Sequence, residues 1–176
     1  MFRMVAAATC RHDPRRRALL RGRVRAEPAL RPPWALEESA FVDACIGCQA
    51  CVEACPEAVL LPGAGQLPVF DPARGECTFC ARCVDACRDS AFRPATERPW
   101  TLQAHIADRC LTHARIVCAS CRDACGEAAI RFPVTSSVPV PVVAADRCTG
   151  CGACVTGCPS GAIALQPFPD EEVMDV

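Results

Sequence analysis

Lysine and tyrosine are absent from this sequence, and tryptophan occurs only twice. Without lysine there is no P-loop lysine to contact phosphates and no amine to form a Schiff base. The segment Gly63-Ala64-Gly65 lacks the third glycine and the following helix of a nucleotide-binding loop, so we expect a turn there. No serine or cysteine stands in a recognisable nucleophile setting with a base. We therefore expect a protein that is not an enzyme in its own right.

A long hydrophobic run is also missing. No window approaches the roughly 18 apolar residues of a membrane-spanning helix, so we expect no membrane span. The segment Asp13–Leu20 weakly resembles a twin-arginine signal, but Arg21, Arg23 and Arg25 follow at once. They occupy the place of the apolar stretch of about 7–15 residues that a secretory signal needs. The expected location is the cytoplasm, where thiols stay reduced.

Charge is distributed unevenly along the chain. Residues 1–31 contain nine arginines and two carboxylates, whereas residues 32–176 contain ten arginines and eighteen carboxylates. We expect residues 1–35 to form a basic, partly disordered arm, because a cluster of like charges is usually solvated. The alternative is docking on an acidic partner surface through Arg15, Arg16, Arg17 and Arg21. No aromatic residue stands among the arginines to stack on bases, so nucleic acid is not an expected partner.

Cysteine, by contrast, occurs seventeen times, close to a tenth of the chain. The run Cys148–Pro159 reads C-x2-C-x2-C-x3-C-P, which is the pattern of bacterial ferredoxins that bind a [4Fe–4S] cluster. Three cysteines spaced by two residues wrap one side of the cubane, and the fourth typically ligates a neighbouring cluster. This run therefore requires a partner run elsewhere in the chain.

The chain supplies three further runs, so the motif is an internal repeat. The runs at residues 45–55 and 77–87 keep the same spacing, whereas the run at 110–125 has seven residues between its first two cysteines. Cys10 stands alone and is not an expected ligand. The four quartets together contain sixteen predicted iron ligands: Cys45, Cys48, Cys51, Cys55, Cys77, Cys80, Cys83, Cys87, Cys110, Cys118, Cys121, Cys125, Cys148, Cys151, Cys154 and Cys158.

Structural zinc and a disulfide framework are the alternatives to clusters. Zinc bound at C-x2-C pairs would leave several cysteines of each quartet unused. Disulfides need an oxidising compartment, which the N-terminal sequence does not predict. Three intact runs of C-x2-C-x2-C-x3-C in one chain therefore favour [4Fe–4S] clusters, three or four in number, as the cofactors.

The residues around the quartets repeat as well. Five residues after each last cysteine stands an apolar residue, preceded by a small or β-branched one. Extended segments at 67–70 and 140–143 lead into cluster loops, and the many prolines fit short edge strands and turns. The sequence predicts an α+β fold of two tandem ferredoxin-like units, built from short strands and short helices, with two clusters in each. We place these units at residues 36–99 and 100–168, with an acidic tail at 169–176.

The natural pairing joins the first quartet with the second and the third with the fourth. In the bacterial two-cluster pattern the fourth ligands cross over, and a different pairing would change only each fourth ligand. We name the four predicted clusters by their ligand sets. Cluster A takes Cys45, Cys48, Cys51 and Cys87, and cluster B takes Cys77, Cys80, Cys83 and Cys55. Cluster C takes Cys110, Cys118, Cys121 and Cys158, and cluster D takes Cys148, Cys151, Cys154 and Cys125.

The third quartet is the weakest of the four, because a longer loop closes a site less tightly. Cluster C is therefore the one that we expect to be labile or to lack one iron. His113 lies in the inserted loop and is expected to be a loop residue, not a ligand. His12 and His105 are expected to be structural or solvated.

Features beyond the cysteine spacing make the chain similar to one family. The stretch Arg16–Gly22 is followed by Arg31-Pro32-Pro33-Trp34, and Pro99–Gln103 precedes the wide spacing from Cys110 to Cys118. In these features, and in its closing cysteine run, the sequence resembles the NapF family of ferredoxin-type proteins of the periplasmic nitrate reductase system. The likeness covers about residues 14–166.

The resemblance implies a cytoplasmic iron–sulfur protein that acts on the precursor of the nitrate reductase catalytic subunit before its export. That role would be in providing or checking the [4Fe–4S] cluster of the subunit. The resemblance also implies that all sixteen quartet cysteines are ligands. Two alternatives stay open: an electron carrier with other redox proteins as partners, and a non-catalytic subunit held permanently in a larger complex.

Overall fold

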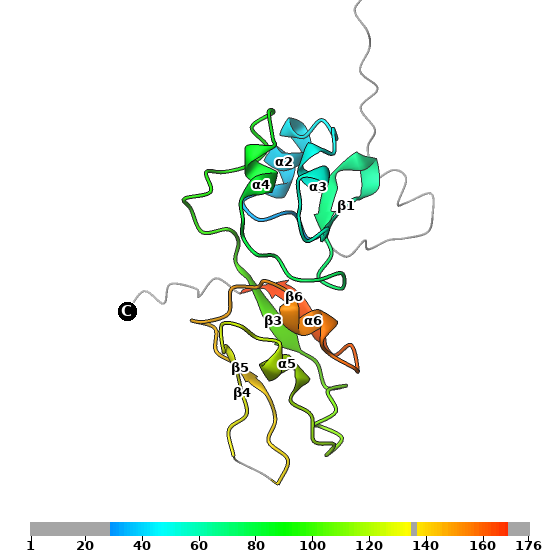
Figure 1. Cartoon of the computed structure of the whole chain (residues 1–176), viewed down its shortest axis with the longest axis vertical. Helices are drawn as coiled ribbons and strands as arrows, with labels where there is room; N and C mark the ends of the chain where they lie inside the picture. The colour runs from blue at the N-terminus through cyan, green and yellow to red at the C-terminus, as the bar shows by residue number, and fades with distance from the viewer. Residues whose placement is uncertain (1–28, 135–136, 169–176) are drawn as a thin grey trace, which may run out of the picture.

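The structure is a computed structural model that describes residues 29–134 and 137–168. Figure 1 shows two lobes, one containing helices α2 to α4 and the other containing α5, α6 and strands β3 to β6. In the described part of the chain no helix has the length and the apolar character of a membrane span. The predictions made for residues 1–28 and 169–176 lie outside the described residues.

The first lobe is built around the first two quartets. Its helices are α2 (Glu38–Ala44), α3 (Ala50–Glu53) and α4 (Arg82–Asp85). Strands β1 (Leu60–Pro62) and β2 (Pro68–Phe70) form an antiparallel hairpin around the 3₁₀ turn η1 (Ala64–Gln66). Pro62 and Pro68 stand opposite each other at the turn end of this two-stranded pairing, where proline costs no ladder hydrogen bond to a further strand.

The second lobe repeats this plan. Its helices are α5 (Ser120–Asp123) and α6 (Ala153–Thr156), and its hairpin consists of β4 (Ile130–Arg131) and β5 (Val142–Val143). A longer antiparallel pair, β3 (Leu102–Ile106) and β6 (Ile163–Pro167), joins the start of the lobe to its end. In the first lobe the matching pair is reduced to a single bridge between Ala35 and Phe92.

These elements confirm the predicted α+β plan of short strands and short helices in tandem. The strands expected at 67–70 and 140–143 are present, but they extend only over the residues of β2 and β5. Helix α2 was not predicted. Phe41 is its only buried side chain, so the sequence shows no apolar periodicity there.

The core of the molecule extends through both lobes. It includes four buried cysteines, one on each of the short helices α3, α4, α5 and α6. Most of the repeated apolar positions after the quartets are also buried: Val59, Leu60, Ala91, Ala129, Ile130, Ala162 and Ile163. Phe92 is half-buried. Cysteine side chains thus take core positions that aliphatic side chains fill in a protein that binds no metal.

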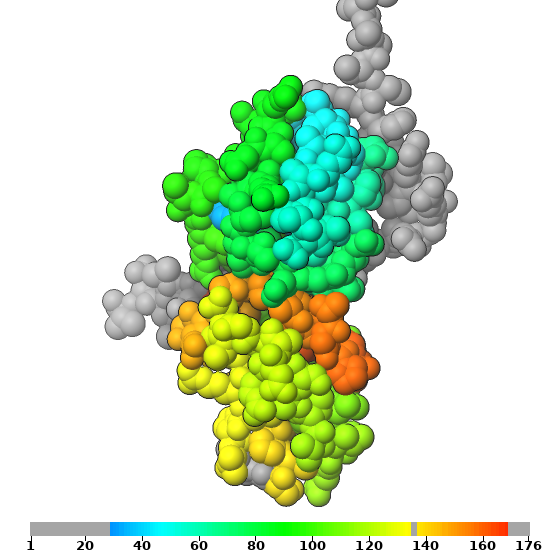
Figure 2. Space-filling view, in the orientation of Figure 1, coloured from blue at the N-terminus to red at the C-terminus, as the bar shows by residue number. Residues whose placement is uncertain are grey.

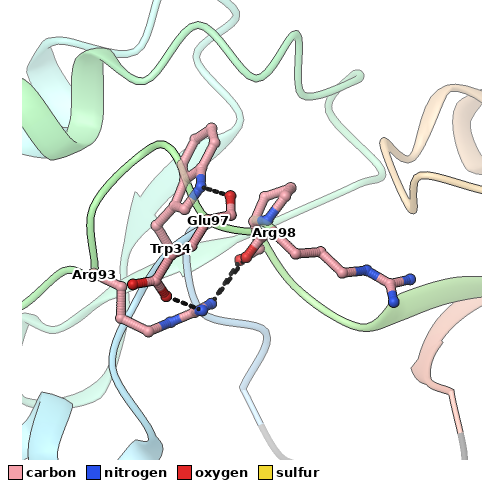
Figure 3. A network of polar contacts seen from close by, with 5 residues as sticks. Trp34, Arg93, Glu97 and Arg98 are labelled. Atoms are coloured by element: carbon pink, nitrogen blue, oxygen red, sulfur yellow. Dashed lines mark hydrogen bonds and ion pairs between the residues drawn. The ribbon is translucent and has the colours of Figure 1, made fainter.

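The segment that enters the first lobe is fastened to the segment that leaves it. Residues 29–35 were predicted as the end of the arm, and Trp34 in this segment is only 4% exposed. Its indole N–H donates to the carbonyl of Glu97 at 2.8 Å. The Arg93 guanidinium binds the Glu97 carboxylate at 2.9 Å and donates to the Arg98 carbonyl at 3.2 Å (Figure 3). Together these bonds anchor the connection between the lobes.

The two lobes meet in direct contact (Figure 2). The Cys77 N–H donates to the Cys151 carbonyl at 2.8 Å, which joins a cluster loop of the first lobe to one of the second. The Trp100 ring lies 5.0 Å from the Phe70 ring and 5.6 Å from the Phe79 ring, measured between centroids. The second and fourth quartets are therefore neighbours across the junction.

Candidate iron–sulfur cluster sites

Three of the four quartets share one backbone course. Two residues after the first cysteine, φ is 71° at Gly47, 51° at Phe79 and 72° at Gly150. Directly after the second cysteine, φ is 67° at Gln49, 60° at Ala81 and 93° at Gly152. Left-handed residues at these two positions curl the chain around the space between the sulfurs, and the short helix begins at once. Ala119, the matching residue of the third quartet, has φ of −136°, so the insertion gives that loop a different course.

All four quartets end in the same turn. The third residue after the last cysteine is left-handed in each, with φ of 50° at Ala58, 52° at Ser90, 48° at Ala128 and 58° at Gly161. In the second lobe this turn directs the next backbone N–H onto the cysteine sulfur. Ala129 donates to Cys125 Sγ at 3.3 Å, and Ala162 donates to Cys158 Sγ at 3.2 Å. Such donors favour the thiolate over the thiol.

Three small cavities of the described chain are each lined by four cysteines. The first is lined by Cys55, Cys77, Cys80 and Cys83, which is the predicted set of cluster B. The second is lined by Cys125, Cys148, Cys151 and Cys154, the predicted set of cluster D. The third is lined by Cys110, Cys118, Cys121 and Cys158, the predicted set of cluster C. In each cavity the structure brings together three cysteines of one quartet and the last cysteine of its partner quartet.

The fourth set, predicted for cluster A, is indicated by the effect of neighbouring thiols on the pKa values of its cysteines. The pKa of Cys45 is raised by burial and, in addition, by the neighbouring thiols of Cys87 and Cys48. The pKa of Cys51 is raised to about 11 by burial, by Cys45 and by Cys48. Cys87 belongs to the second quartet, so it lies near Cys45 of the first quartet, as the crossed set of cluster A requires.

Burial dominates the acid–base behaviour of the central cysteines. Burial, with a smaller contribution from neighbouring thiols, raises the pKa of Cys77 to about 11 and the pKa values of Cys83 and Cys154 to about 12. These thiols hold their protons at neutral pH, and binding to iron displaces the protons. Cys158 differs, because the Ser160 hydroxyl and nearby backbone N–H groups outweigh its burial and lower its pKa.

The cysteine sets fit a cluster better than a single ion. Within residues 29–134 and 137–168, no three His, Cys, Asp or Glu side chains converge as the ligands of one metal ion would. A cubane binds each thiolate at a different iron, so its ligands stand further apart than those of one ion. Four sulfurs around one space are the donor set of a [4Fe–4S] cluster.

The remaining predicted site residues have varied positions. His113 is exposed in the inserted loop, and its Nδ1 lies 3.2 Å from the backbone carbonyl oxygen of Asp108, away from the cysteine-lined cavity. His105 is exposed on β3. Cys10, His12 and the four arginines of the predicted docking surface lie outside the described residues.

Sequence reasoning missed two kinds of contact at these sites. Trp100 donates its indole N–H to the carbonyl of Thr149, inside the loop between Cys148 and Cys151, at 2.8 Å. Hydroxyl groups also lie beside three sulfurs of the cluster C set, each two residues after the cysteine that it contacts. A C-x-[ST] spacing was visible in the sequence, but the spacing alone does not show that the hydroxyl turns toward the sulfur.

Two family models match the chain at these sites. Residues 44–92 match a 4Fe-4S dicluster domain, and residues 140–163 match a 4Fe-4S binding domain. With its crossed cysteine sets and its short repeated elements, the chain is an iron–sulfur protein of the ferredoxin type.

Curated relatives narrow this class. Ferredoxin-type protein NapF of Escherichia coli (strain K12) is 41% identical over 156 residues, which are 88% of this chain and 95% of the relative. The Haemophilus influenzae protein of the same name is 40% identical over 81% of this chain and 82% of its own. A methylamine utilization ferredoxin-type protein, MauM, of Methylorubrum extorquens is 32% identical over 81% of this chain and 74% of its own. No solved structure matches the chain. The chain belongs to the NapF family of ferredoxin-type proteins.

Proposed function

We propose that this protein acts in the cytoplasm in the maturation of the periplasmic nitrate reductase catalytic subunit. In this role it provides or checks the [4Fe–4S] cluster of the subunit precursor before export, and it is not itself an enzyme. Membership of the NapF family supports the choice of partner. The main support for a role in cluster delivery is that the loop of the third quartet follows a different backbone course from the other three. A site that closes less tightly releases its cluster more readily.

The proposal includes four clusters held by the sixteen quartet cysteines in the crossed sets A to D. Three cavities lined by four cysteines each, and the effect of the Cys87 thiol on the pKa of Cys45, support these sets. When bound, the clusters supply one-electron chemistry or a transferable iron–sulfur unit. The chain's own contribution is to bury the sulfurs and to direct backbone N–H groups onto them.

The test is a transfer experiment under anaerobic conditions. The chain is loaded with ⁵⁷Fe and incubated with the apo form of the nitrate reductase catalytic subunit. The two proteins are then separated, and the amount of ⁵⁷Fe in each is measured by mass spectrometry. We expect the label to appear in the subunit, while the chain loses iron from cluster C. A Cys121→Ala variant, which lacks a ligand of cluster C, should deliver none, whereas Cys83→Ala should still deliver. Label that stays entirely on the chain would contradict delivery.

Electron transfer is the second candidate function, and the junction between the lobes favours it. Because Cys77 and Cys151 are joined by a hydrogen bond, clusters B and D would be neighbours. In the same experiment, an electron carrier would keep its iron, and the reduced chain would become oxidised when a cluster-loaded subunit is supplied. Stoichiometric co-purification without either change would indicate a permanent subunit of a complex.

A further inference from the structure

The site predicted for cluster C differs from the other three in the side chains that contact its sulfurs. The oxygen-to-sulfur distances are 3.3 Å from Thr112 to Cys110, 3.7 Å from Ser120 to Cys118 and 3.6 Å from Ser160 to Cys158. Among residues 29–134 and 137–168, no side-chain hydroxyl is hydrogen-bonded to a sulfur of the sets for clusters A, B or D. Three of the four sulfurs in one set therefore have a hydroxyl partner.

The chemistry of coordination decides the direction of these hydrogen bonds. A thiolate bound to iron carries no proton, so the hydroxyl is the only possible donor in each pair. Thr112 is the one buried polar side chain of the described chain, at 4% exposure, so water does not compete for its hydroxyl. Its carbonyl accepts from the Arg115 N–H at 3.0 Å, which holds the inserted loop around it.

We propose that the hydroxyl groups of Thr112, Ser120 and Ser160 raise the reduction potential of cluster C. This inference rests on the proposed ligand set of that cluster. A reduced cluster carries one more negative charge than the oxidised cluster, and part of this charge lies on the thiolate sulfurs. Donors to these sulfurs therefore stabilise the reduced form more than the oxidised form.

The hydroxyl donors determine how strongly cluster C holds an electron. A low-potential one-electron donor is oxidised by one electron, and the oxidised cluster C takes up that electron with no bond made or broken. With the three hydroxyl donors in place, the electron is held more strongly than it would be by the same four thiolates without them. The hydroxyls are thus tuning residues, and they are not ligands.

The test is a redox titration of the full-length, cluster-loaded chain with dithionite, followed by electron paramagnetic resonance. The cluster C signal is identified as the one lost in Cys121→Ala. We expect Thr112→Val to shift the midpoint potential of this signal to a more negative value, because valine has the same shape but no donor. Ser120→Ala and Ser160→Ala should give smaller shifts in the same direction, since their oxygen-to-sulfur distances are longer. These two variants remove one atom each, so they keep the test valid if Thr112→Val folds poorly.

Thr156 provides a matched control. It also follows a cysteine by two residues, Cys154, but it is exposed at the end of α6 and makes no hydrogen bond to a sulfur. Thr156→Val should therefore leave all potentials unchanged. An unchanged cluster C potential in all three hydroxyl variants would overturn the tuning role and leave the proposed ligand sets intact. Full iron content and all signals retained in Cys121→Ala would instead overturn the ligand set, and the inference would fail with it.

Discussion

At the scale of single residues, Gly150 has the least room for a side chain among the glycines that the structure describes. A Cβ at this position would overlap the Leu102 carbonyl oxygen and would lie 2.9 Å from Trp100 Nε1. Its φ of 72° also lies in the left-handed region. The loop between the first two ligands of cluster D is thus seated directly on β3 and on the tryptophan at the junction.

We expect Gly150→Ala to accelerate cluster loss in urea. The backbone strain of a left-handed alanine is about 1–2 kcal/mol, and overpacking adds roughly 1–3 kcal/mol. Gly161→Ala is the matched control, because Gly161 has φ of 58° but no atom within 4 Å of its Cβ position. The measurement is the decay of the visible cluster absorbance. Equal decay rates in both variants would show that the close packing at Gly150 is unimportant.

At the scale of elements, the inserted loop of the third quartet is the clearest departure from the repeat. Residues 113–117 are all exposed, and Val117 is exposed by 81%. A loop with so few contacts and such length opens at a lower free energy than the three compact loops. Cluster C is therefore the site from which iron should escape first.

We expect an iron chelator to remove the iron of one cluster in a fast phase and the rest more slowly. The fast phase should be missing from Cys121→Ala and present in Cys154→Ala, which lacks a ligand of cluster D. Iron release followed by the absorbance of the chelate complex measures both phases. A fast phase that survives in Cys121→Ala would place the labile iron elsewhere.

The elements that could be predicted from the sequence are those encoded by local spacing. Cysteine intervals and the repeated apolar positions led to the four short helices, to the neighbourhood of β2 and β5, and to the tandem plan. The general two-cluster pattern predicted that Cys87 of the second quartet lies near Cys45 of the first, and the two thiols are neighbours in the structure.

Contacts that depend on tertiary packing could not be predicted in this way. Helix α2 buries only Phe41, so it has no hydrophobic period. The position of Trp100 between the lobes depends on how two distant loops meet. The side chain of Thr112 turns toward Cys110 because of the course of the inserted loop, which local propensity does not encode.

At the scale of the whole molecule, the two lobes are joined by a few specific contacts. We expect Trp100→Phe to loosen the junction, because it removes the hydrogen bond to Thr149 and keeps an aromatic ring. A bond of this kind contributes about 1 kcal/mol, so the Cys77 amide should exchange hydrogen up to about fivefold faster. Trp34→Phe loses an equivalent bond, to Glu97, and keeps a ring beside Phe79, so the exchange of the Cys77 amide should change less. Hydrogen exchange with mass spectrometry measures the peptide that contains Cys77, and identical exchange in wild type and Trp100→Phe would contradict this account of the junction.

The basic arm should act through long-range charge. We propose that Arg15, Arg16, Arg17 and Arg21 dock on an acidic surface of the nitrate reductase subunit. Replacing all four by Gln should weaken binding and flatten its dependence on salt concentration, because exposed charges are screened by ions. The control replaces four exposed arginines of the body by Gln: Arg88, Arg115, Arg131 and Arg147. Titration calorimetry at several salt concentrations measures both variants, and an equal effect of the two would show that only net charge matters.

The crossed ligand sets are the central claim, and counting iron in paired cysteine variants tests them most directly. Cys45→Ala/Cys87→Ala removes two ligands of cluster A, although these cysteines belong to different quartets. Cys45→Ala/Cys55→Ala removes one ligand of A and one of B from a single quartet. Our account predicts that the first variant loses the iron of one cluster and the second loses that of two. The reverse result, with two clusters lost in the first variant and one in the second, would show that each quartet holds its own cluster.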